Sequence, residues 1–410
     1  MMAVVVAFTA YVGFLGFFVY VCMYADPETS PLAEFMTETL PRRAWETCQR
    51  VFGKKNAKGV EWVVDRAMIL FYVVVVFGSW SIIFAYVYPW IGRQSYVSQA
   101  HRVVGCFVFA SCVLSWRFAS TSSPGIITKQ SLSMYDHFPY DGLMYISNKR
   151  CPTRKIPRLA RSKFDRYKYN ENVPRFDHFC GWIFNTIGEQ NYRWFLLFLT
   201  VHVCMCIYGA VVLFYLFYGH ILDNELHKVV FFNRATGEDI APGNKWFLAQ
   251  YMFHKFFMET GVFLLMAVMA ITLGAFLGYH IWITSKGLTT NETYKWDEIK
   301  KWYGDELKRY KQAVKDGLTV EEKASPPTVS DGDVTCTPGQ SQQQPKAKED
   351  EDEAVAEADD EYEMARDPGA LPVNIYDRGF VENWREVIFP ISLRKRKQLE
   401  ARGEEKKKAN

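Results

Sequence analysis

Long stretches without charged side chains dominate the first 285 residues of this 410-residue chain. A bilayer core is about 30 Å thick, so a helix needs about 20 consecutive apolar residues to cross it. Five stretches approach that length, namely residues 3–24, 67–90, 103–118, 194–218 and 257–283. The first lacks the basic start and the small-residue cleavage site of a signal peptide, so we expect it to remain as an anchor. The sequence therefore predicts an α-helical multi-pass membrane protein with about five transmembrane helices.

The placement of basic residues predicts how the chain is oriented in the membrane. Arg and Lys are frequent between the first two spans and between the third and fourth, whereas the short loop after Trp90 offers only Arg93 and Arg102. Cytosolic loops carry an excess of Arg and Lys, so the two basic segments and the C-terminal tail are predicted to be cytosolic. The N-terminus and the loop at residues 219–255 then face the lumen. The totals, 48 Lys and Arg against 45 Asp and Glu, argue against a nucleic-acid-binding protein.

One short motif holds the three side chains of an activated nucleophile. Asp177, His178 and Cys180 lie within four residues, in the sequence Asp-His-Phe-Cys, between the third and fourth spans. A histidine can take the proton of a thiol, a carboxylate can orient the imidazole, and the thiolate can attack a carbonyl carbon. The segment is too polar to cross the membrane, yet predicted membrane helices flank it on both sides. This chemistry would therefore take place near the membrane surface.

Other motifs accompany this one in a fixed order. They are Ser123-Pro124-Gly125, Cys151, residues 160–163, residues 185–195, Thr289-Thr290-Asn291-Glu292, and residues 374–379 followed by Asn383-Trp384. In this order and topology the chain resembles the DHHC protein S-acyltransferases, multi-pass enzymes that transfer a fatty acyl chain from acyl-CoA to a protein cysteine. The extra N-terminal span and the sequences around Gly125 and Pro139 are most similar to the branch that acylates cysteines close to the transmembrane spans of its substrates.

The resemblance implies a role for each matching residue. Cys180 would carry the acyl thioester, His178 would be the general base, and Asp177 would orient the imidazole. Thr290 and Glu292 would fix the cytosolic end of the last span, and Asn383 would tie the C-terminal motif to the core. Acyl-CoA would be the co-substrate, its phosphates attracted by nearby Arg and Lys, and its chain would lie between the spans. Membrane-associated proteins would be the substrates, accessory or complex subunits further partners, and the endoplasmic reticulum or Golgi the location.

The chain departs from the family at the positions that bind zinc. The family folds this segment on two zinc ions through cysteines and histidines, ligands that suit tetrahedral zinc. Here the first set reads Cys151, Arg154, Phe164 and Asn172, and the second reads Asp165, Lys168, Phe179 and Thr186. We therefore expect no zinc. Packing of aromatic side chains would replace it, involving Phe164, Tyr167, Tyr169, Phe176, Phe179, Trp182 and Phe184.

These observations predict six segments. Residues 1–118 would form three spans with a basic cytosolic loop, and residues 119–193 an irregular, zinc-less catalytic segment in the cytosol. Residues 194–285 would hold the fourth and fifth spans with a lumenal loop, and residues 286–323 the cytosolic Thr-Thr-x-Glu site and a helix. An acidic, Pro-, Ser- and Gln-rich linker at 324–370 is predicted to be disordered. A docking motif and a basic tail would follow at 371–410.

Three interpretations remain open. The chain is an active S-acyltransferase, or it is a pseudoenzyme kept as a structural or assembly subunit of a membrane complex, such as one in an organelle. The third class, a channel or transporter, usually places ionisable groups along a path through its spans. His202, Glu259 and His280 do not form such a path in the sequence, and each is interpreted as a packed or interfacial residue.

Overall fold

The computed structural model describes residues 35, 39–233, 237–317 and 367–398. The chain divides into two compact units, residues 1–72 and 73–410. In the first unit the described residues form the beginning of helix α3 (Leu40–Ile82), which has a non-helical backbone at Gly53. The second unit holds the other elements, including the whole Asp-His-Phe-Cys motif.

Four helices within the described residues are long and apolar enough to cross a membrane. They cover Arg66–Val87, Ala100–Thr121, Tyr192–Asp223 and Phe257–Ser285, and correspond to α3 with the π-helix η2 (Ile83–Val87), α4, α6 and α8. These four agree with the second to fifth predicted spans, and the prediction of a helical multi-pass membrane protein is confirmed. The predicted first span, residues 3–24, lies outside the described residues.

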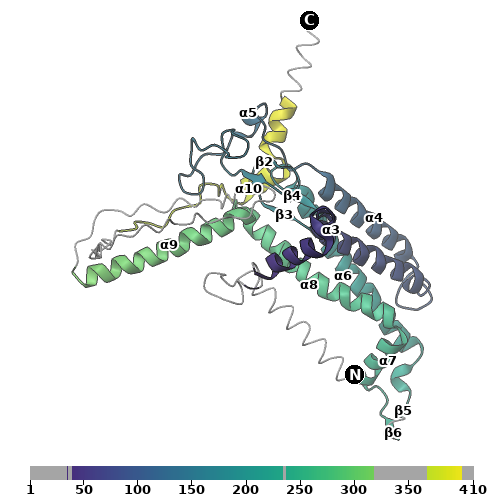
Figure 1. Ribbon diagram of the computed structural model, residues 1–410. Coiled ribbons are helices and arrows are strands. Elements are labelled where there is room, and N and C mark those ends of the chain that lie inside the picture. The colour runs from purple at the N-terminus through teal and green to yellow at the C-terminus, as the bar shows by residue number, and fades with distance from the viewer. Residues whose placement is uncertain (1–34, 36–38, 234–236, 318–366, 399–410) are drawn as a thin grey trace. The chain divides into compact units, whose positions relative to one another are not determined.

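Helices α6 and α8 pack side by side, and α4 packs against α6 (Figure 1). Their contact surface is a single apolar cluster that includes Cys112, Met205, Leu216 and Met266. Because lipid tails are as apolar as these side chains, van der Waals packing rather than burial from water holds the helices together. The side chains that could take part in chemistry lie instead in the polar segments at the two ends of these helices.

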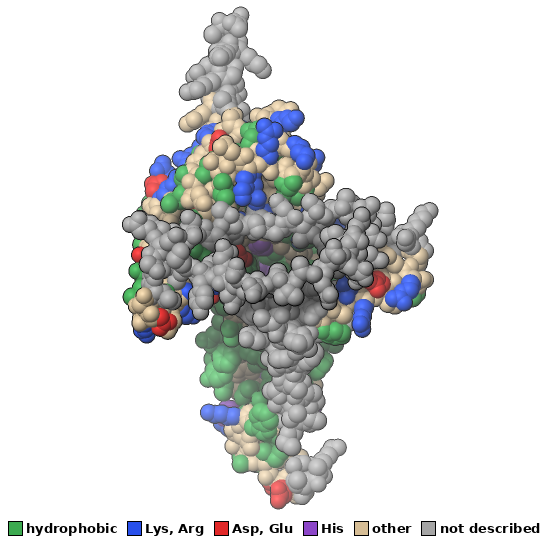
Figure 2. All heavy atoms as spheres, turned by 60° about the vertical axis from the view of Figure 1, so that its left-hand side comes forward, with side chains coloured by type: hydrophobic (Ala, Val, Ile, Leu, Met, Phe, Trp, Pro, Cys, Tyr) green, Lys and Arg blue, Asp and Glu red, His purple; other side chains and the backbone are tan. Residues whose placement is uncertain are grey.

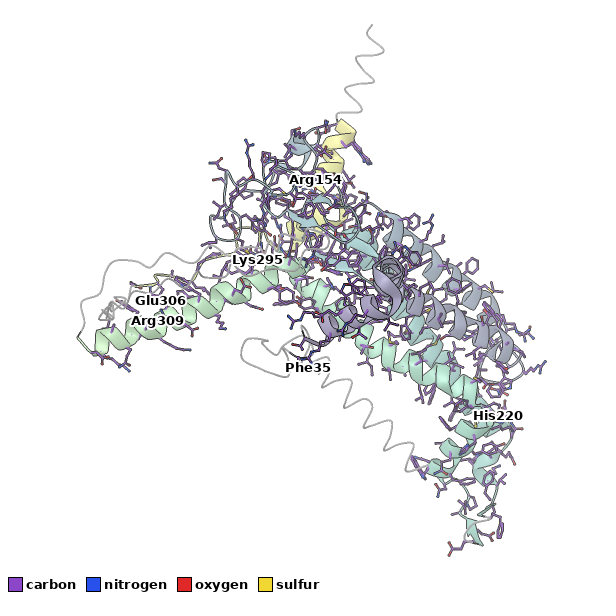
Figure 3. The ribbon with its side chains drawn as sticks, in the orientation of Figure 1. Phe35, Arg154, His220, Lys295, Glu306 and Arg309 are labelled. Carbon is purple, nitrogen blue, oxygen red and sulfur yellow. The ribbon has the colours of Figure 1, made fainter. Side chains whose placement is uncertain are left out.

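One end of α6 and α8 is joined by the loop that was predicted to be lumenal. It contains the 3-10 helix η3 (Leu226–Lys228), the paired strands β5 (Phe231–Asn233) and β6 (Glu238–Ile240), and helix α7 (Lys245–Lys255). His220 lies at this end and Arg154 at the opposite end (Figure 3). The two polar segments are therefore separated by the length of the membrane helices.

The opposite end carries the segment between α4 and α6. It consists of a short helix, α5 (Leu132–Tyr135), and two hairpins with long irregular connections. Strand β1 (Lys163–Asp165) pairs with β2 (Glu171–Val173), and β3 (His178–Cys180) pairs with β4 (Asn185–Ile187), both antiparallel. The Asp-His-Phe-Cys motif thus begins the second hairpin.

Two later elements return to the same end. Helix α9 (Thr290–Lys315) begins shortly after α8, and α10 (Phe380–Ile388) packs against α8 and α6 (Figure 1). Gly287 makes the turn between α8 and α9 at φ +67°, and a Cβ there would lie 2.5 Å from the carbonyl oxygen of Tyr376. Residues 391–398 form a further helix. Most of the predicted disordered linker, residues 324–366, lies outside the described residues.

Figure 2 shows that Lys and Arg side chains gather on the visible face at the end that carries the C-terminal helix, whereas hydrophobic side chains are frequent farther along. This distribution matches the charge pattern from which the orientation was predicted.

Candidate functional site

The β3–β4 hairpin places two of the three motif side chains on one face. Alternate residues of a strand point to the same side, so His178 and Cys180 share a face and Phe179 points to the other. Cys180 lies opposite Asn185 and is buried, with 7% of its surface exposed. The thiol and the imidazole are therefore neighbours by strand geometry.

The carboxylate of Asp177 orients the imidazole of His178 through its Nδ1 nitrogen. Its Oδ2 lies 2.6 Å from His178 Nδ1, and the carboxylate is buried. Thr290, the first residue of α9, donates to this carboxylate twice, from its backbone N–H to Oδ1 and from its hydroxyl to Oδ2, both at 2.8 Å. Because a carboxylate at Nδ1 leaves Nε2 as the free nitrogen, Nε2 is the atom available for proton transfer.

The pair is strongly polarised. Burial alone would raise the pKa of Asp177, but the hydrogen bond and charge of His178, with the N–H of Thr290, lower that pKa to about 2. Burial likewise opposes the charged form of His178, yet hydrogen bonds with Asp177 and Cys180 outweigh burial and raise its pKa to about 10. An imidazole with so high a pKa is a strong base, so a proton taken from a thiol would be held firmly.

The Thr-Thr-x-Glu sequence performs three separate tasks. Thr289 is the N-cap of α9, where its side chain accepts from the backbone N–H of Glu292 and the Glu292 side chain accepts from the N–H of Thr289, a capping box. Thr290 binds Asp177. The Glu292 carboxylate also binds Arg161 through two hydrogen bonds, 2.7 Å from Nε and 2.6 Å from Nη2. Both charged side chains are almost completely buried, at 1% and 0% exposure.

The C-terminal motif closes the site from another side. Asn383 donates to the carbonyl oxygen of Ser285 at 3.0 Å and to Asp377 at 2.8 Å. Glu386 lies 3.6 Å from Arg161 and 3.2 Å from Arg175, the residue two positions before Asp177. A buried network of charges therefore joins the segment between α4 and α6 to α9 and α10.

Sequence reasoning missed several members of this network. Asp177, His178, Cys180, Thr290, Glu292 and Asn383 were singled out, whereas Arg175, Glu386 and the capping role of Thr289 were not. His280, interpreted from the sequence as a packed or interfacial residue, has its ring centroid 5.8 Å from that of His178. The sequence signal for His280 was its position in the last turns of the span that ends just before the Thr-Thr-x-Glu sequence.

The positions that would bind zinc in the family are occupied by other interactions. Lys168 Nζ donates to the carbonyl oxygens of Ser120 at 3.1 Å and Phe184 at 3.0 Å, and to Asn185 Oδ1 at 2.9 Å. Asp165 accepts three backbone N–H groups, those of residues 167, 168 and 169. These side chains do not fit a tetrahedral zinc site, because an ammonium has no lone pair to offer and the carboxylate is already hydrogen-bonded.

The first set of ligand positions does not fit zinc either. Arg154 binds the carbonyl oxygen of Asn170 and forms an ion pair of 2.6 Å with Glu171. Phe164 and Asn172 face each other across the β1–β2 hairpin. Cys151 is buried in an apolar cluster against which Phe164 packs. Among the residues that the structure describes, no three His, Cys, Asp or Glu side chains converge as metal ligands.

The expected aromatic packing is present in part. Phe179 stacks on Tyr167 with ring centroids 4.8 Å apart and meets the edge of Phe184 at 5.6 Å. Tyr167 and Trp182 themselves remain 56% and 43% exposed. The expectation that packing of all seven aromatic side chains replaces the metal is therefore too broad. The charged side chains of Lys168 and Asp165 also stabilise this corner of the segment, the place where the family would hold its second zinc ion.

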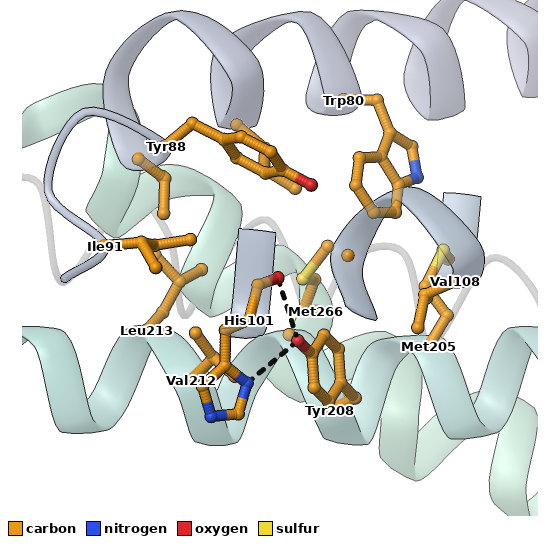
Figure 4. Close-up of a pocket in the computed structure, with 14 residues that line it drawn as sticks. Trp80, Tyr88, Ile91, His101, Val108, Met205, Tyr208, Val212, Leu213 and Met266 are labelled. Carbon is orange, nitrogen blue, oxygen red and sulfur yellow. Dashed lines mark hydrogen bonds between the residues drawn. The ribbon is translucent and has the colours of Figure 1, made fainter. Parts of the chain in front are cut away.

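Two cavities are relevant to a substrate with a charged head and an apolar chain. A cavity of about 440 Å³ opens beside Asp177 and His178 and is also lined by Lys163, Arg166 and Thr290. A second cavity, of about 40 Å³, lies among the membrane helices and is lined by apolar side chains with the His101–Tyr208 pair (Figure 4). The Gly209 wall of this cavity is 17 residues along α6 from Tyr192, or about 25 Å at 1.5 Å per residue.

Comparison with known proteins agrees with this geometry. Residues 144–297 match the family described as DHHC palmitoyltransferase. The palmitoyltransferase SWF1 of Yarrowia lipolytica is 31% identical over 287 residues, covering 68% of this chain and 68% of that protein. The palmitoyltransferase ZDHHC4 of Bos taurus is 30% identical over 186 residues, covering 45% of this chain and 53% of the relative. The palmitoyltransferase swf1 of Schizosaccharomyces pombe is 31% identical over 188 residues, 45% of this chain and 48% of the relative. The chain belongs to the DHHC palmitoyltransferase family.

Proposed function

We propose that this protein is an active S-acyltransferase that moves a long-chain acyl group from acyl-CoA onto Cys180 and then onto a cysteine of a membrane-associated protein. The observation that carries the proposal is the 2.6 Å contact between Asp177 and His178, fixed by Thr290 and placed on the strand face that carries Cys180. Base, orienting group and nucleophile are thus assembled in the order that thiol acyl transfer needs.

In the first half-reaction, the proton of the Cys180 thiol already rests on His178 Nε2, so the sulfur enters the reaction as a thiolate beside an imidazolium. The sulfur attacks the carbonyl carbon of the acyl-CoA thioester and forms a new carbon–sulfur bond. The bond to the CoA sulfur then breaks, and His178 returns the proton to that sulfur, so that CoA leaves as a thiol. Asp177 favours this sequence because its charge stabilises the imidazolium that holds the thiol proton until CoA leaves.

In the second half-reaction, the same imidazole takes the proton of the substrate cysteine. The substrate sulfur attacks the carbonyl carbon of the acyl-enzyme, and the bond to Cys180 breaks. Cys180 leaves as a thiolate beside the imidazolium of His178, which restores the starting state. One base therefore serves both steps, as microscopic reversibility suggests.

The cavities give each part of acyl-CoA a place. Lys163 and Arg166 border the cavity beside His178, and cationic side chains of this kind bind phosphate groups. The acyl chain would extend from Cys180 between the membrane helices toward the cavity near Gly209. Burying each methylene group there is worth about 0.8 kcal/mol.

The same proposal assigns the remaining parts of the chain. Residues 119–193, the α9 segment and the C-terminal motif face the cytosol, and the loop at residues 219–255 faces the lumen of the endoplasmic reticulum or Golgi. Zinc has no role, because Lys168 and Asp165 occupy the corner where the family would hold a metal. The substrate cysteine lies close to a transmembrane span of its protein, as the resemblance to that branch of the family suggests.

Incorporation of a clickable long-chain acyl group from its CoA thioester tests the proposal. Purified protein should become labelled, the label should be released by hydroxylamine, and Cys180→Ser should abolish it. Absence of label in both proteins would contradict the proposal and favour the pseudoenzyme interpretation, a structural or assembly subunit of a membrane complex.

A further inference from the structure

A second histidine lies at the catalytic site and has no part in the mechanism given so far. His280 is in the last turns of α8 and is 1% exposed. Its ring centroid lies 5.8 Å from that of His178, and Phe195 meets both rings edge-on, at 5.1 Å and 4.9 Å. Cys180 shares a strand face with His178, so both the nucleophile and His280 are neighbours of the base.

The hydrogen bonds of His280 indicate which nitrogen carries its proton. Thr284 Oγ1 donates to the phenol oxygen of Tyr192 at 3.3 Å, and that phenol lies 2.9 Å from His280 Nδ1. Since the Tyr192 oxygen already accepts from Thr284, its own proton is free to point at Nδ1. His280 Nδ1 is then an acceptor, and the ring proton is on Nε2.

The other nitrogen, Nε2, is buried and has no hydrogen-bond partner among the residues that the structure describes. Buried polar groups nearly always have a partner, and the exceptions tend to have a catalytic or ligand-binding reason. An unused N–H donor next to the base of an acyl transferase is such an exception.

Acyl transfer needs a donor at this place. When a thiolate attacks a thioester, negative charge develops on the carbonyl oxygen, and a fixed N–H or O–H group that points at that oxygen lowers the barrier. His178 moves protons, while Asp177 and Thr290 hold His178, so none of the three is free for this task. A neutral imidazole can act as such an electrophilic donor in a protected site.

We propose that His280 donates the hydrogen bond from Nε2 that stabilises the carbonyl oxygen of the thioester as it becomes an oxyanion, in both half-reactions. His280 neither gains nor loses a proton, and Tyr192 is the positioning residue that holds it in the required tautomer. The inference rests on the proposed S-acyltransferase activity, and it adds a catalytic residue to the motif.

The test compares two substitutions of His280 that differ in whether they keep a donor. His280→Gln retains an N–H near the position of Nε2, whereas His280→Met fills the space without one. In single-turnover acylation by a long-chain acyl-CoA, His280→Met should be slower by about 10²–10³-fold, the loss usual for removing one oxyanion donor. His280→Gln should be slower by less than about 10-fold. Tyr192→Phe should give a loss between those of the two His280 variants, because the imidazole stays in place but its proton is no longer held on Nε2.

His202, a buried histidine on α6 that bonds the carbonyl oxygen of Phe198, provides the matched control. His202→Met should leave the acylation rate within about 3-fold of wild type. Binding of a thioether analogue of acyl-CoA should be unchanged by His280→Met, because the analogue has no carbonyl oxygen to accept a hydrogen bond from Nε2.

Three outcomes would overturn the inference. They are a wild-type rate in His280→Met, equal losses in His280→Gln and His280→Met, and a loss that is matched by weaker binding of the analogue. Failure of the proposed function is a separate result, since wild-type protein would then show no more label than Cys180→Ser.

Discussion

Asp177 is the residue that most clearly separates a working site from a relic. A carboxylate buried without compensation would be costly, but this one accepts hydrogen bonds from His178 and twice from Thr290. Thr290 comes from a helix 113 positions later in the chain, so the contact exists only in the folded protein. Each of these partners favours the charged form of Asp177.

This arrangement predicts how pH affects stability. The pKa of Asp177 is lowered to about 2, so its contribution to stability is present above its unfolded pKa of 3.8 and is lost as the pH falls through about 2. The pKa of His178 is raised to about 10, so its contribution is complete below 6.5 and is lost as the pH rises through about 10. Thermal unfolding should therefore show the largest gap between wild type and Asp177→Asn at about pH 4 to 6.5.

The gap should become smaller toward both pH extremes. Asp239→Asn, a substitution of an exposed carboxylate on β6, should show no comparable gap at any pH. A difference between wild type and Asp177→Asn that stays constant from pH 3 to pH 10 would mean that the two side chains do not form a charged pair.

At the scale of elements, α9 and α10 are fastened to the catalytic segment by buried charges. Arg161 and Glu292 form a two-pronged ion pair that is almost fully buried, and Arg161 also donates to the carbonyl oxygen of Gly287 at 2.7 Å. Removing one partner of such a pair leaves an uncompensated charge inside the protein. The helix and the segment would then lose their common anchor.

Arg161→Met should therefore lower the free energy of unfolding by about 3–5 kcal/mol. The chain contains a matched pair for comparison: Arg154 and Glu171 are also 2.6 Å apart but are 38% and 27% exposed. Arg154→Met should cost no more than about 1 kcal/mol. Chemical denaturation in detergent measures both variants, and equal losses would show that burial does not decide the role of Arg161.

Lys168 stabilises the corner of the segment where the family would hold a zinc ion. Lys168→Met removes three hydrogen bonds from an ammonium group and should lower the free energy of unfolding by about 2 kcal/mol or more. Lys300→Met, on the exposed face of α9, should have little effect.

Elemental analysis should find no stoichiometric zinc in the wild type, and a chelator should not change its unfolding temperature.

A zinc content of one or two ions per chain would contradict this prediction and would require a different alignment of the segment.

Phe179→Ala is a further test of how this segment is stabilised. The ring is only half-buried, so we expect a loss of about 1–2 kcal/mol, less than the 3–5 kcal/mol of a fully buried phenylalanine.

The sequence predicted the elements that depend on local patterns. The second to fifth spans were visible as uncharged stretches, and Asp177, His178 and Cys180 were visible because they are nearly contiguous. The network around Arg161 could not be predicted, because an ion pair between residues 131 positions apart depends on how the chain folds back. His280 was missed for the same reason, since its distance from His178 is set by the packing of α8 against the hairpin.

At the scale of the whole molecule, the account requires one orientation in the membrane. Arg154 and His220 lie at opposite ends of the membrane helices (Figure 3). The basic residues of the catalytic segment predict that the Arg154 end is cytosolic. Acyl-CoA in the cytosol could then reach the cavity beside His178.

Engineered glycosylation acceptors measure this orientation. Ala235→Thr creates an acceptor at Asn233 in the loop between α6 and α8, and Arg150→Thr creates one at the exposed Asn148 in the catalytic segment. In microsomal membranes the first should be glycosylated and the second should not. The reverse pattern would place the catalytic segment in the lumen and would contradict the proposed function.

The most direct test of the central claim is to locate the acyl group on the chain by peptide mass spectrometry after brief exposure to a long-chain acyl-CoA. The protein contains its own controls, because Cys106 and Cys204 lie on the outer surface of the membrane helices α4 and α6, whereas Cys180 is buried beside His178. The account predicts a hydroxylamine-sensitive acyl group on Cys180 in the wild type and far less of it in His178→Ala. Modification of Cys106 and Cys204 with none on Cys180, or equal modification of Cys180 in wild type and His178→Ala, would contradict it.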